Sequence, residues 1–210
     1  MTKELSIQQI EAFHKNKKRI NKTILIQIKR NDSVIFGGHA LNAHLPPFLD
    51  RPTKDFDVFT KNPKKSASEL EKKLDKQFGS DLFFTKPAIH PGTIKVMNRV
   101  TEGEVADFSK PKKQILIVKK TIDGKRIRIA SLPFIKQGLK KILKDPESKF
   151  RHAKDRDALR RIRVAENLKK KRIMIAIRKQ PRPIITSKIL QSSSLNNILK
   201  TSMKRTRRVI

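Results

Sequence analysis

Apolar residues recur at helical spacing near the start of the chain. Ile7, Ile10 and Phe13 repeat at every third position within residues 5–20, a stretch that contains no Gly or Pro. This spacing predicts an amphipathic helix. The following apolar segment Ile24–Ile28 fits either the end of a helix or a short strand, because it is too short for its period to decide between them.

Serine residues mark the starts of two further predicted helices. Ser66 and Glu69 form a capping-box pattern, after which apolar residues repeat at helical spacing as far as Gly79. Ser131 is the expected N-cap of a helix that runs to Leu143. A longer helix is expected from Lys149, with four apolar residues on its buried side: Phe150, Ala158, Ile162 and Ala165.

Short apolar or alternating runs predict strands between these helices. The predicted strands are Val34–Phe36, Asp55–Phe59, Leu82–Thr85, Ile94–Met97, Glu104–Phe108, Ile115–Ile122 and Lys125–Ile129. The last two are joined through Asp123-Gly124, a pair that readily forms the tight turn of a hairpin. Basic residues alternate with isoleucine in Lys125–Ile129, so this basic face meets either solvent or nucleic acid. The pattern predicts an α/β (α+β) fold with a small mixed sheet flanked by helices.

Residues 33–59 combine several features that bear on chemistry. The strand ending at Phe36 is followed by Gly37-Gly38, which opens a short helix, and glycine lets backbone N–H groups approach a phosphate closely. Asp55 and Asp57 are two residues apart on a strand and therefore share one face. Two carboxylates together with the phosphates of a nucleoside triphosphate are a typical ligand set for Mg²⁺. Each feature alone is also common without such a role, Gly-Gly as a turn and Asp-x-Asp as an exposed strand face.

The charge of the chain points to an anionic partner. Its 210 residues carry a formal net charge of +32, which attracts polyanions, nucleic acid first and an anionic membrane surface second. The absence of cysteine excludes disulfides and thiolate metal sites. No apolar run approaches the roughly 18 residues that a membrane span requires. We therefore expect a soluble, intracellular protein, with cytoplasm, nucleus and virion left open.

The motif in residues 33–59 resembles that of the nucleotidyltransferase-fold superfamily related to polymerase beta. The family pattern is a strand, Gly-Gly, a helix and then Arg-x-Ser/Thr-x-Asp-apolar-Asp, which matches Gly37-Gly38 and the segment from Arg51 to Asp57. The second segment is similar to that of toxin-type and large-virus poly(A) polymerase-like members. The resemblance implies a third metal-binding carboxylate on a later strand, and Asp107 matches it.

The resemblance also implies a reaction and a set of site residues. It implies metal-dependent transfer of a nucleoside monophosphate from a nucleoside triphosphate to an acceptor, with release of pyrophosphate. Mg²⁺ or Mn²⁺ is the implied cofactor, held by the catalytic residues Asp55, Asp57 and Asp107. The implied nucleotide-binding residues are Gly37, Gly38, Arg51, Lys54 and Lys154. Lys154 belongs to a segment similar to the family's Lys-Asp-x-x-Asp motif; the alternative is that Lys154, Asp155 and Asp157 only form ion pairs along a helix.

The C-terminal part of the chain is strongly basic. Residues 166–210 contain 13 Lys or Arg and one acid, which is typical of extensions that bind nucleic acid without sequence preference. The expected nucleic-acid-binding residues are Lys169, Lys170, Lys171, Arg172, Lys204, Arg205, Arg207 and Arg208. The predicted organisation is an N-terminal helical segment (1–19), a nucleotidyltransferase-like domain (20–165) and this basic, partly flexible extension (166–210).

Three functions remain open from the sequence. The first is transfer to an RNA 3′ end, poly(A) polymerase-like or tRNA-modifying, which the positive charge favours. The second is a non-enzymatic, basic nucleic-acid-binding protein with a degenerate nucleotidyltransferase fold, since a fold does not fix a function. The third is a protein-modifying nucleotidyltransferase. The nucleotide, the acceptor, the oligomeric state and the need for a partner subunit are not determined by the sequence.

Overall fold

The computed structural model describes residues 5–179, and the remaining residues, 1–4 and 180–210, are outside this description. Residue contacts divide the chain into two compact units, residues 1–167 and 168–210. The sheet and the site described below belong to the first unit. None of the helices in the described part of the chain has the length and apolar character needed to cross a bilayer.

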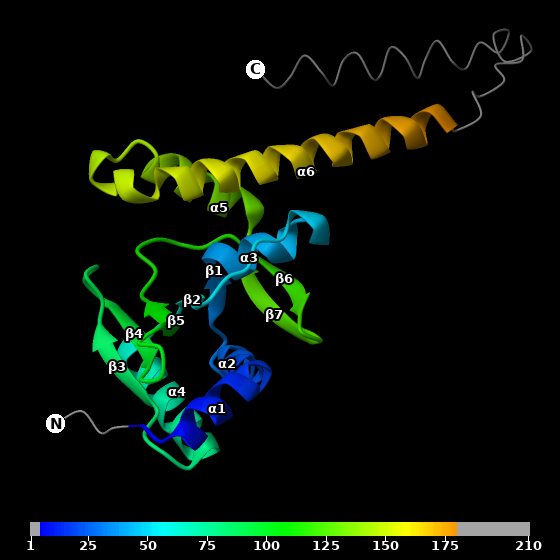
Figure 1. Ribbon diagram of the computed structural model, residues 1–210. Helices are drawn as coiled ribbons and strands as arrows, with labels where there is room; N and C mark the ends of the chain where they lie inside the picture. Colours follow the sequence, from blue (N-terminus) through cyan, green and yellow to red (C-terminus); the bar gives the residue numbers. More distant parts are fainter. Residues whose placement is uncertain (1–4, 180–210) are drawn as a thin grey trace, which may run out of the picture. The chain divides into compact units, whose positions relative to one another are not determined.

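Seven strands form one mixed sheet in the order β3-β4-β5-β2-β1-β7-β6 (Figure 1). The strands are β1 (Val34–Phe36), β2 (Phe56–Phe59), β3 (Phe83–Pro87), β4 (Thr93–Asn98), β5 (Glu104–Ser109), β6 (Ile117–Ile122) and β7 (Lys125–Ala130). The pairs β1/β7 and β2/β5 are parallel, and the other neighbours are antiparallel. All seven predicted strands are confirmed, with ends shifted by at most two residues.

In residues 5–179, six α-helices accompany the sheet (Figure 1). They are α1 (Ile7–Lys15), α2 (Lys17–Arg30), α3 (Gly37–His44), α4 (Pro63–Phe78), α5 (Leu132–Ile142) and α6 (His152–Lys179), with 3-10 helices at Pro47–Leu49 and Pro146–Arg151. α4 packs on β3, β4 and β5, while α2 packs on β7 and on α4. The mixed sheet with flanking helices confirms the predicted fold class.

Alternation along β2 separates the core from the site. Phe56 and Val58 are fully buried beneath the helices, whereas Asp57 between them points to the other face. The ambiguous segment Ile24–Ile28 is helical and lies within α2, where Ile24 and Ile28 are both buried. A helix suits this segment because its buried residues repeat at a spacing of four.

Three local predictions are corrected. The single helix expected over residues 5–20 is broken at Asn16, whose side-chain amide and backbone N–H bond back to the last turn of α1. α4 begins at Pro63 with Asn62 as its N-cap, because Ser66 is buried inside the helix and bonded to Thr60 instead. Phe150, expected to be buried, is 86% exposed because it lies in the 3-10 turn before α6.

The ends of the predicted domains fall within helices. The expected boundary between residues 19 and 20 lies inside α2, and the one between residues 165 and 166 lies inside α6. Lys169, Lys170, Lys171 and Arg172 are all exposed on α6. The other expected nucleic-acid-binding residues, Lys204, Arg205, Arg207 and Arg208, are outside the described residues.

Candidate active site

Asp57 lies against the glycine turn at the start of α3. A Cβ atom on Gly37 would stand 1.9 Å from Asp57 Oδ2, and Gly37 has a φ of +62°, so both space and backbone conformation require glycine. The Gly38 backbone N–H favours the charged form of the Asp57 carboxylate and so opposes the rise of its pKa. A Cβ atom on Gly38 would stand 2.6 Å from Thr53 Cγ2. The two glycines thus allow the acid-bearing segment to pack directly on the start of α3.

Asp107 stands beside Asp57 on the neighbouring strand. The two residues are register partners in the parallel pair β2/β5. Asp55 directly precedes β2, and one carboxylate oxygen each of Asp55, Glu104 and Asp107 lies within 4.8 Å of the others. The structure therefore brings two of the three predicted acids, Asp55 and Asp107, together with Glu104. The third, Asp57, is not in this cluster and lies against Gly37, as the register partner of Asp107.

Glu104 is an acid that the sequence pattern does not assign to the site. In a regular strand Glu104 and Asp107 would face opposite sides, because they are three residues apart. The pairing of β4 with β5 shifts, however, between Val96↔Ala106 and Met97↔Glu104, which leaves Val105 as an extra residue in β5. Such a bulge turns Glu104 to the same face as Asp107. Sequence alone offers no signal for this shift.

A lysine provides the acids with positive charge within the chain. Lys95 on β4 is the register partner of Asp107 and forms an ion pair with Glu104. The Lys95 side chain is 23% exposed and that of Glu104 is 32% exposed, so the pair is partly shielded from water. Lys95 therefore offsets part of the repulsion among these carboxylates.

The electrostatics of Asp57 and Asp107 suit a cation ligand. Burial, and then repulsion from Asp55, raises the pKa of Asp57 to about 6. Burial, and then the charge of Glu104, raises the pKa of Asp107 to about 7, against the opposing effect of Lys95. Asp107 Oδ1 is buried without a hydrogen-bond partner among the described residues. A buried carboxylate oxygen with no donor fits a divalent metal, which prefers oxygen ligands.

The predicted nucleotide-binding side chains lie around these acids. Lys154 is exposed near the start of α6, and its positive charge, like that of Arg151, lowers the pKa of Asp57. Arg51 and Lys54 are exposed in the loop that leads to Asp55. Of these three cations, Lys154 is the one whose charge acts on Asp57, whereas the charge of Arg51 lowers the pKa of Asp157.

The residues that follow Lys154 have structural partners. Asp155 is only 2% exposed and forms an ion pair with Arg151 at 2.9 Å, so it is a buried residue and not a surface one. Asp157 forms an ion pair with Arg160 at 2.9 Å and another with Arg161 at 3.2 Å. The ion-pair interpretation thus describes the two aspartates, whereas the exposed Lys154 stays a predicted nucleotide ligand.

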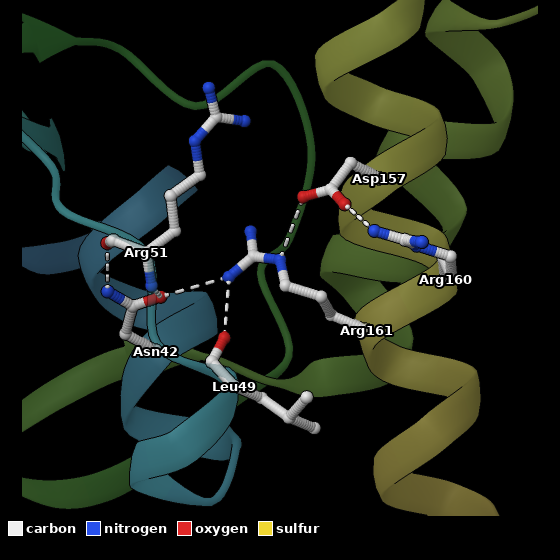
Figure 2. A network of polar contacts seen from close by, with 6 residues as sticks. All are labelled: Asn42, Leu49, Arg51, Asp157, Arg160 and Arg161. Carbon is white, nitrogen blue, oxygen red and sulfur yellow. Dashed lines mark hydrogen bonds and ion pairs between the residues drawn. The ribbon is translucent and has the colours of Figure 1, made fainter.

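A polar network joins α6 to the loop that leads to Asp55 (Figure 2). Arg161 Nη1 donates hydrogen bonds to the Leu49 carbonyl oxygen at 3.0 Å and to Asn42 Oδ1 at 3.4 Å. The Asn42 amide in turn donates to the Arg51 carbonyl oxygen at 2.6 Å and accepts from the Arg51 N–H at 3.3 Å. Figure 2 shows the Arg51 side chain pointing away from Arg161. The network therefore fixes the backbone of this loop and leaves the Arg51 guanidinium free of it.

His39 follows the glycines but faces the interior. Its ring stacks on Phe56 with 3.9 Å between ring centroids and 3° between planes. Burial is the main cause that lowers the pKa of His39, so the imidazole is neutral at physiological pH. A packing role at the helix start accounts for both observations.

Comparison with known proteins supports this fold. No family model matches the sequence, and no curated protein matches it. Among solved structures, the Megavirus polyadenylate synthase matches with a TM-score of 0.61 and 18% identity over 76% of this chain and 34% of that one. The chain thus spans about a third of that enzyme's length.

Two further solved structures match with lower TM-scores. An antigenic nucleotidyltransferase-like protein from Paracoccidioides brasiliensis has a TM-score of 0.41 and 14% identity over 70% of this chain and 77% of that one. The antibiotic-resistance factor ANT(2'')-Ia has a TM-score of 0.46 and 15% identity over 78% of this chain and 96% of that one. Together with the mixed sheet and the glycine turn at β1, the Megavirus match shows that the chain has a nucleotidyltransferase fold.

Proposed function

We propose that the chain is a metal-dependent nucleotidyltransferase that moves a nucleoside monophosphate from a nucleoside triphosphate to an RNA 3′ end. The observation that supports this proposal is the cluster of Asp55, Glu104 and Asp107 at one end of β2 and β5, within a nucleotidyltransferase fold. Asp57 is the register partner of Asp107 and lies against the Gly37 turn. Proteins of this fold can lack catalytic activity, so the proposed chemistry is inferred from the acids and not from the fold.

The proposed cofactor is Mg²⁺ or Mn²⁺, held by Asp55, Asp57 and Asp107 with Glu104 beside them. When bound, such a metal neutralises charge on the triphosphate and lowers the pKa of an acceptor hydroxyl. The acidic side chains would hold it at the end of β2 and β5, where Asp107 Oδ1, which has no hydrogen-bond partner among the described residues, would be a ligand. Phosphoryl chemistry of this kind depends mainly on positioning and electrostatics, which these residues supply.

Basic residues around the acids are the proposed triphosphate ligands. The three proposed ligands are exposed cations: Lys154 on α6, and Arg51 and Lys54 in the loop before Asp55. Each can form charge-assisted hydrogen bonds with a polyphosphate. The backbone N–H groups of Gly37 and Gly38 are further proposed phosphate ligands, in a turn where Asp57 and Thr53 already take the space that a Cβ would need. The loop backbone that carries Arg51 is held by Asn42 and Arg161, which limits the conformational entropy lost on binding.

RNA is the proposed acceptor because of charge and of the structural match. A net charge of +32 favours a polyanionic substrate, and the solved structure with the higher TM-score is a polyadenylate synthase. The activity would then be poly(A) polymerase-like or tRNA-modifying. The exposed Lys169, Lys170, Lys171 and Arg172 on α6 are proposed to contact RNA.

The test is incorporation of label from each nucleoside triphosphate in turn into RNA, with Mg²⁺ or Mn²⁺ present. The Asp55→Ala/Asp57→Ala variant is expected to lose at least about a hundredfold in rate, since charge stabilisation is the largest part of such catalysis. Glu11→Ala/Glu147→Ala is the matched control, because it removes two exposed acids outside the loop and the strands that carry the proposed site and should stay near wild type.

Two outcomes would overturn the proposal in different ways. No incorporation by the wild type, with equal RNA binding by wild type and variant, would indicate a nucleic-acid-binding protein. Label that resists RNase and stays on protein would instead indicate a protein acceptor.

A further inference from the structure

A basic groove lies between the end of α2 and the β6/β7 hairpin. Its volume is about 340 Å³. Four of its lining side chains are cationic: Lys29, Lys119, Arg126 and Arg128. The one acidic lining residue is Asp32. The groove therefore has a surplus of positive charge that residues within it do not neutralise.

Strand register brings part of this charge together. Lys119 on β6 stands directly opposite Arg128 on β7 in the antiparallel pair. Like charges in such a pair destabilise the sheet unless an anion lies between them. Asp32 supplies one such charge, because Arg128 Nη1 donates to its carboxylate and, at 3.1 Å, to its backbone carbonyl oxygen. Lys119 and Arg126 remain exposed beside that pair.

Nearby cations act on the same carboxylate. The hydrogen bond from Arg128 is the main cause that lowers the pKa of Asp32, and the charges of Lys61 and Lys119 add to it. Asp32 is thus ionised across the physiological pH range and already forms an ion pair with Arg128. A further anion must come from outside these side chains.

The shape of the site favours a chain of phosphates over a membrane. A concave groove lined by one sign of charge concentrates field lines on a ligand that enters it. Its apolar members, Ile28 and Ile127, are each only 1% exposed and so offer nothing that could insert into a bilayer. No aromatic residue lines the groove, which points to contact with a backbone and not to stacking of bases.

The groove and the acids lie at opposite ends of β1. Ser33, which lines the groove, directly precedes β1, whereas Gly37 directly follows it. Four residues of extended strand separate these two positions by about 13 Å. A ligand in the groove therefore occupies a different site from a nucleotide beside Asp57. Only an acceptor several nucleotides long could reach both sites at once.

From this geometry we propose that the groove formed by Lys29, Lys119, Arg126 and Arg128 binds the phosphodiester backbone of RNA, remote from the acids. Binding there is independent of sequence, because the groove supplies charge and no donors placed for base edges. RNA held in this groove while its 3′ end meets the acids would make the chain favour long acceptors over short ones.

The test measures the affinity of the full chain for a fluorescein-labelled oligouridylate by anisotropy over a range of salt concentrations. Lys119→Gln/Arg126→Gln leaves the Arg128–Asp32 pair intact and removes two cations. The slope of log K against log[salt] is expected to fall by about 1.4, and the affinity at 0.1 M salt by roughly ten- to thirtyfold. Lys140→Gln/Lys141→Gln, two exposed lysines on α5, is the charge-matched control.

Equal losses in the two variants would overturn the proposal, since the effect would then be one of net charge alone. If Lys119→Gln/Arg126→Gln lost binding to phosphatidylserine vesicles but kept binding to RNA, the proposal would be overturned in favour of a membrane surface. The anisotropy measurement of RNA binding does not require nucleotide transfer. A wild-type protein without transferase activity would therefore contradict the proposed function but not affect this test. In an active enzyme, Lys119→Gln/Arg126→Gln should slow transfer to a long RNA while transfer to a trinucleotide stays unchanged.

Discussion

Gly37 is the residue at which the fold and the site constrain each other most closely. Its φ of +62° is costly for any residue with a Cβ, and the place that a Cβ would take is filled by Asp57 Oδ2 at 1.9 Å. The Gly38 backbone N–H also favours the charged form of the Asp57 carboxylate. One glycine therefore sets both the turn after β1 and the position of a proposed metal ligand.

We predict that Gly37→Ala lowers the free energy of unfolding by more than Gly79→Ala does. Gly79 has a φ of +65° and nothing within 4 Å of its would-be Cβ, so its substitution measures the backbone cost alone, about 1 kcal/mol. Urea unfolding of both variants checks the difference.

The clash with Asp57 can be separated from the backbone cost by a double-mutant cycle. Adding Asp57→Ala to Gly37→Ala should recover the excess loss, because the two side chains then no longer compete for space. Equal losses for Gly37→Ala and Gly79→Ala would contradict a steric role for Asp57.

Single acids were predictable from sequence only where the strand was regular. Alternation predicts that Asp55 and Asp57 share a face, and the family resemblance predicts Asp107, which is the register partner of Asp57. Glu104 was missed because the extra residue Val105 changes which face it points to. A register shift depends on the partner strand and leaves no mark in the residues themselves.

Between elements, Arg161 is the contact that ties α6 to the loop before Asp55. Its side chain is 14% exposed and bonds to the Leu49 carbonyl oxygen and to Asn42. Its Nε also lies 3.2 Å from Asp157 Oδ2, an ion pair without hydrogen-bond geometry. A largely buried guanidinium of this kind is expensive to remove, because Asn42 and the Leu49 carbonyl oxygen lose a donor and Asp157 loses a counter-charge.

We predict that Arg161→Met lowers the free energy of unfolding by about 1–3 kcal/mol and exposes residues 46–54 to proteolysis. Arg160→Met is the matched control, since Arg160 pairs with the same Asp157 but is 78% exposed, and it should cost at most about 0.5 kcal/mol. Similar stability and similar cleavage of the two variants would show that the network does not hold the loop.

The periodicity of the sequence predicts the helices and strands themselves. It does not predict where each helix ends or which strands pair. The seven strands and the hairpin at Asp123-Gly124 were predictable because alternation and turn residues are local signals. The break at Asn16 and the start of α4 at Pro63 depend on which competing cap is used. The parallel pairing of β2 with β5 joins residues about 50 positions apart, which no local pattern specifies.

For the molecule as a whole, the acids make stability depend on pH and, if the proposed function holds, on metal. The pKa values of Asp57 and Asp107 are raised to about 6 and about 7, so between about pH 4 and pH 7 the folded state binds more protons than the unfolded state. The contribution of these two groups to stability is therefore greatest at low pH and falls as pH rises through this window. Divalent metal should oppose that fall, because it binds the deprotonated carboxylates.

We predict that millimolar Mg²⁺ or Mn²⁺ raises the unfolding temperature by a few degrees at pH 8 and has little effect at pH 5. Thermal unfolding with and without metal over this range measures the effect. Asp107→Asn should weaken both the fall with pH and the response to metal. A metal response that is equal at the two pH values, or unchanged in Asp107→Asn, would place the binding elsewhere.

The surplus of 51 Lys and Arg over 19 Asp and Glu sets the order in which ligands arrive at the acids. A free divalent cation approaches a molecule of the same sign and is repelled, whereas a nucleoside triphosphate that already carries the cation remains an anion and is drawn in. Added monovalent salt screens both effects. Higher ionic strength should therefore help the bare cation to bind while it hinders the metal–nucleotide complex and RNA, so that cofactor and substrates respond to salt in opposite directions.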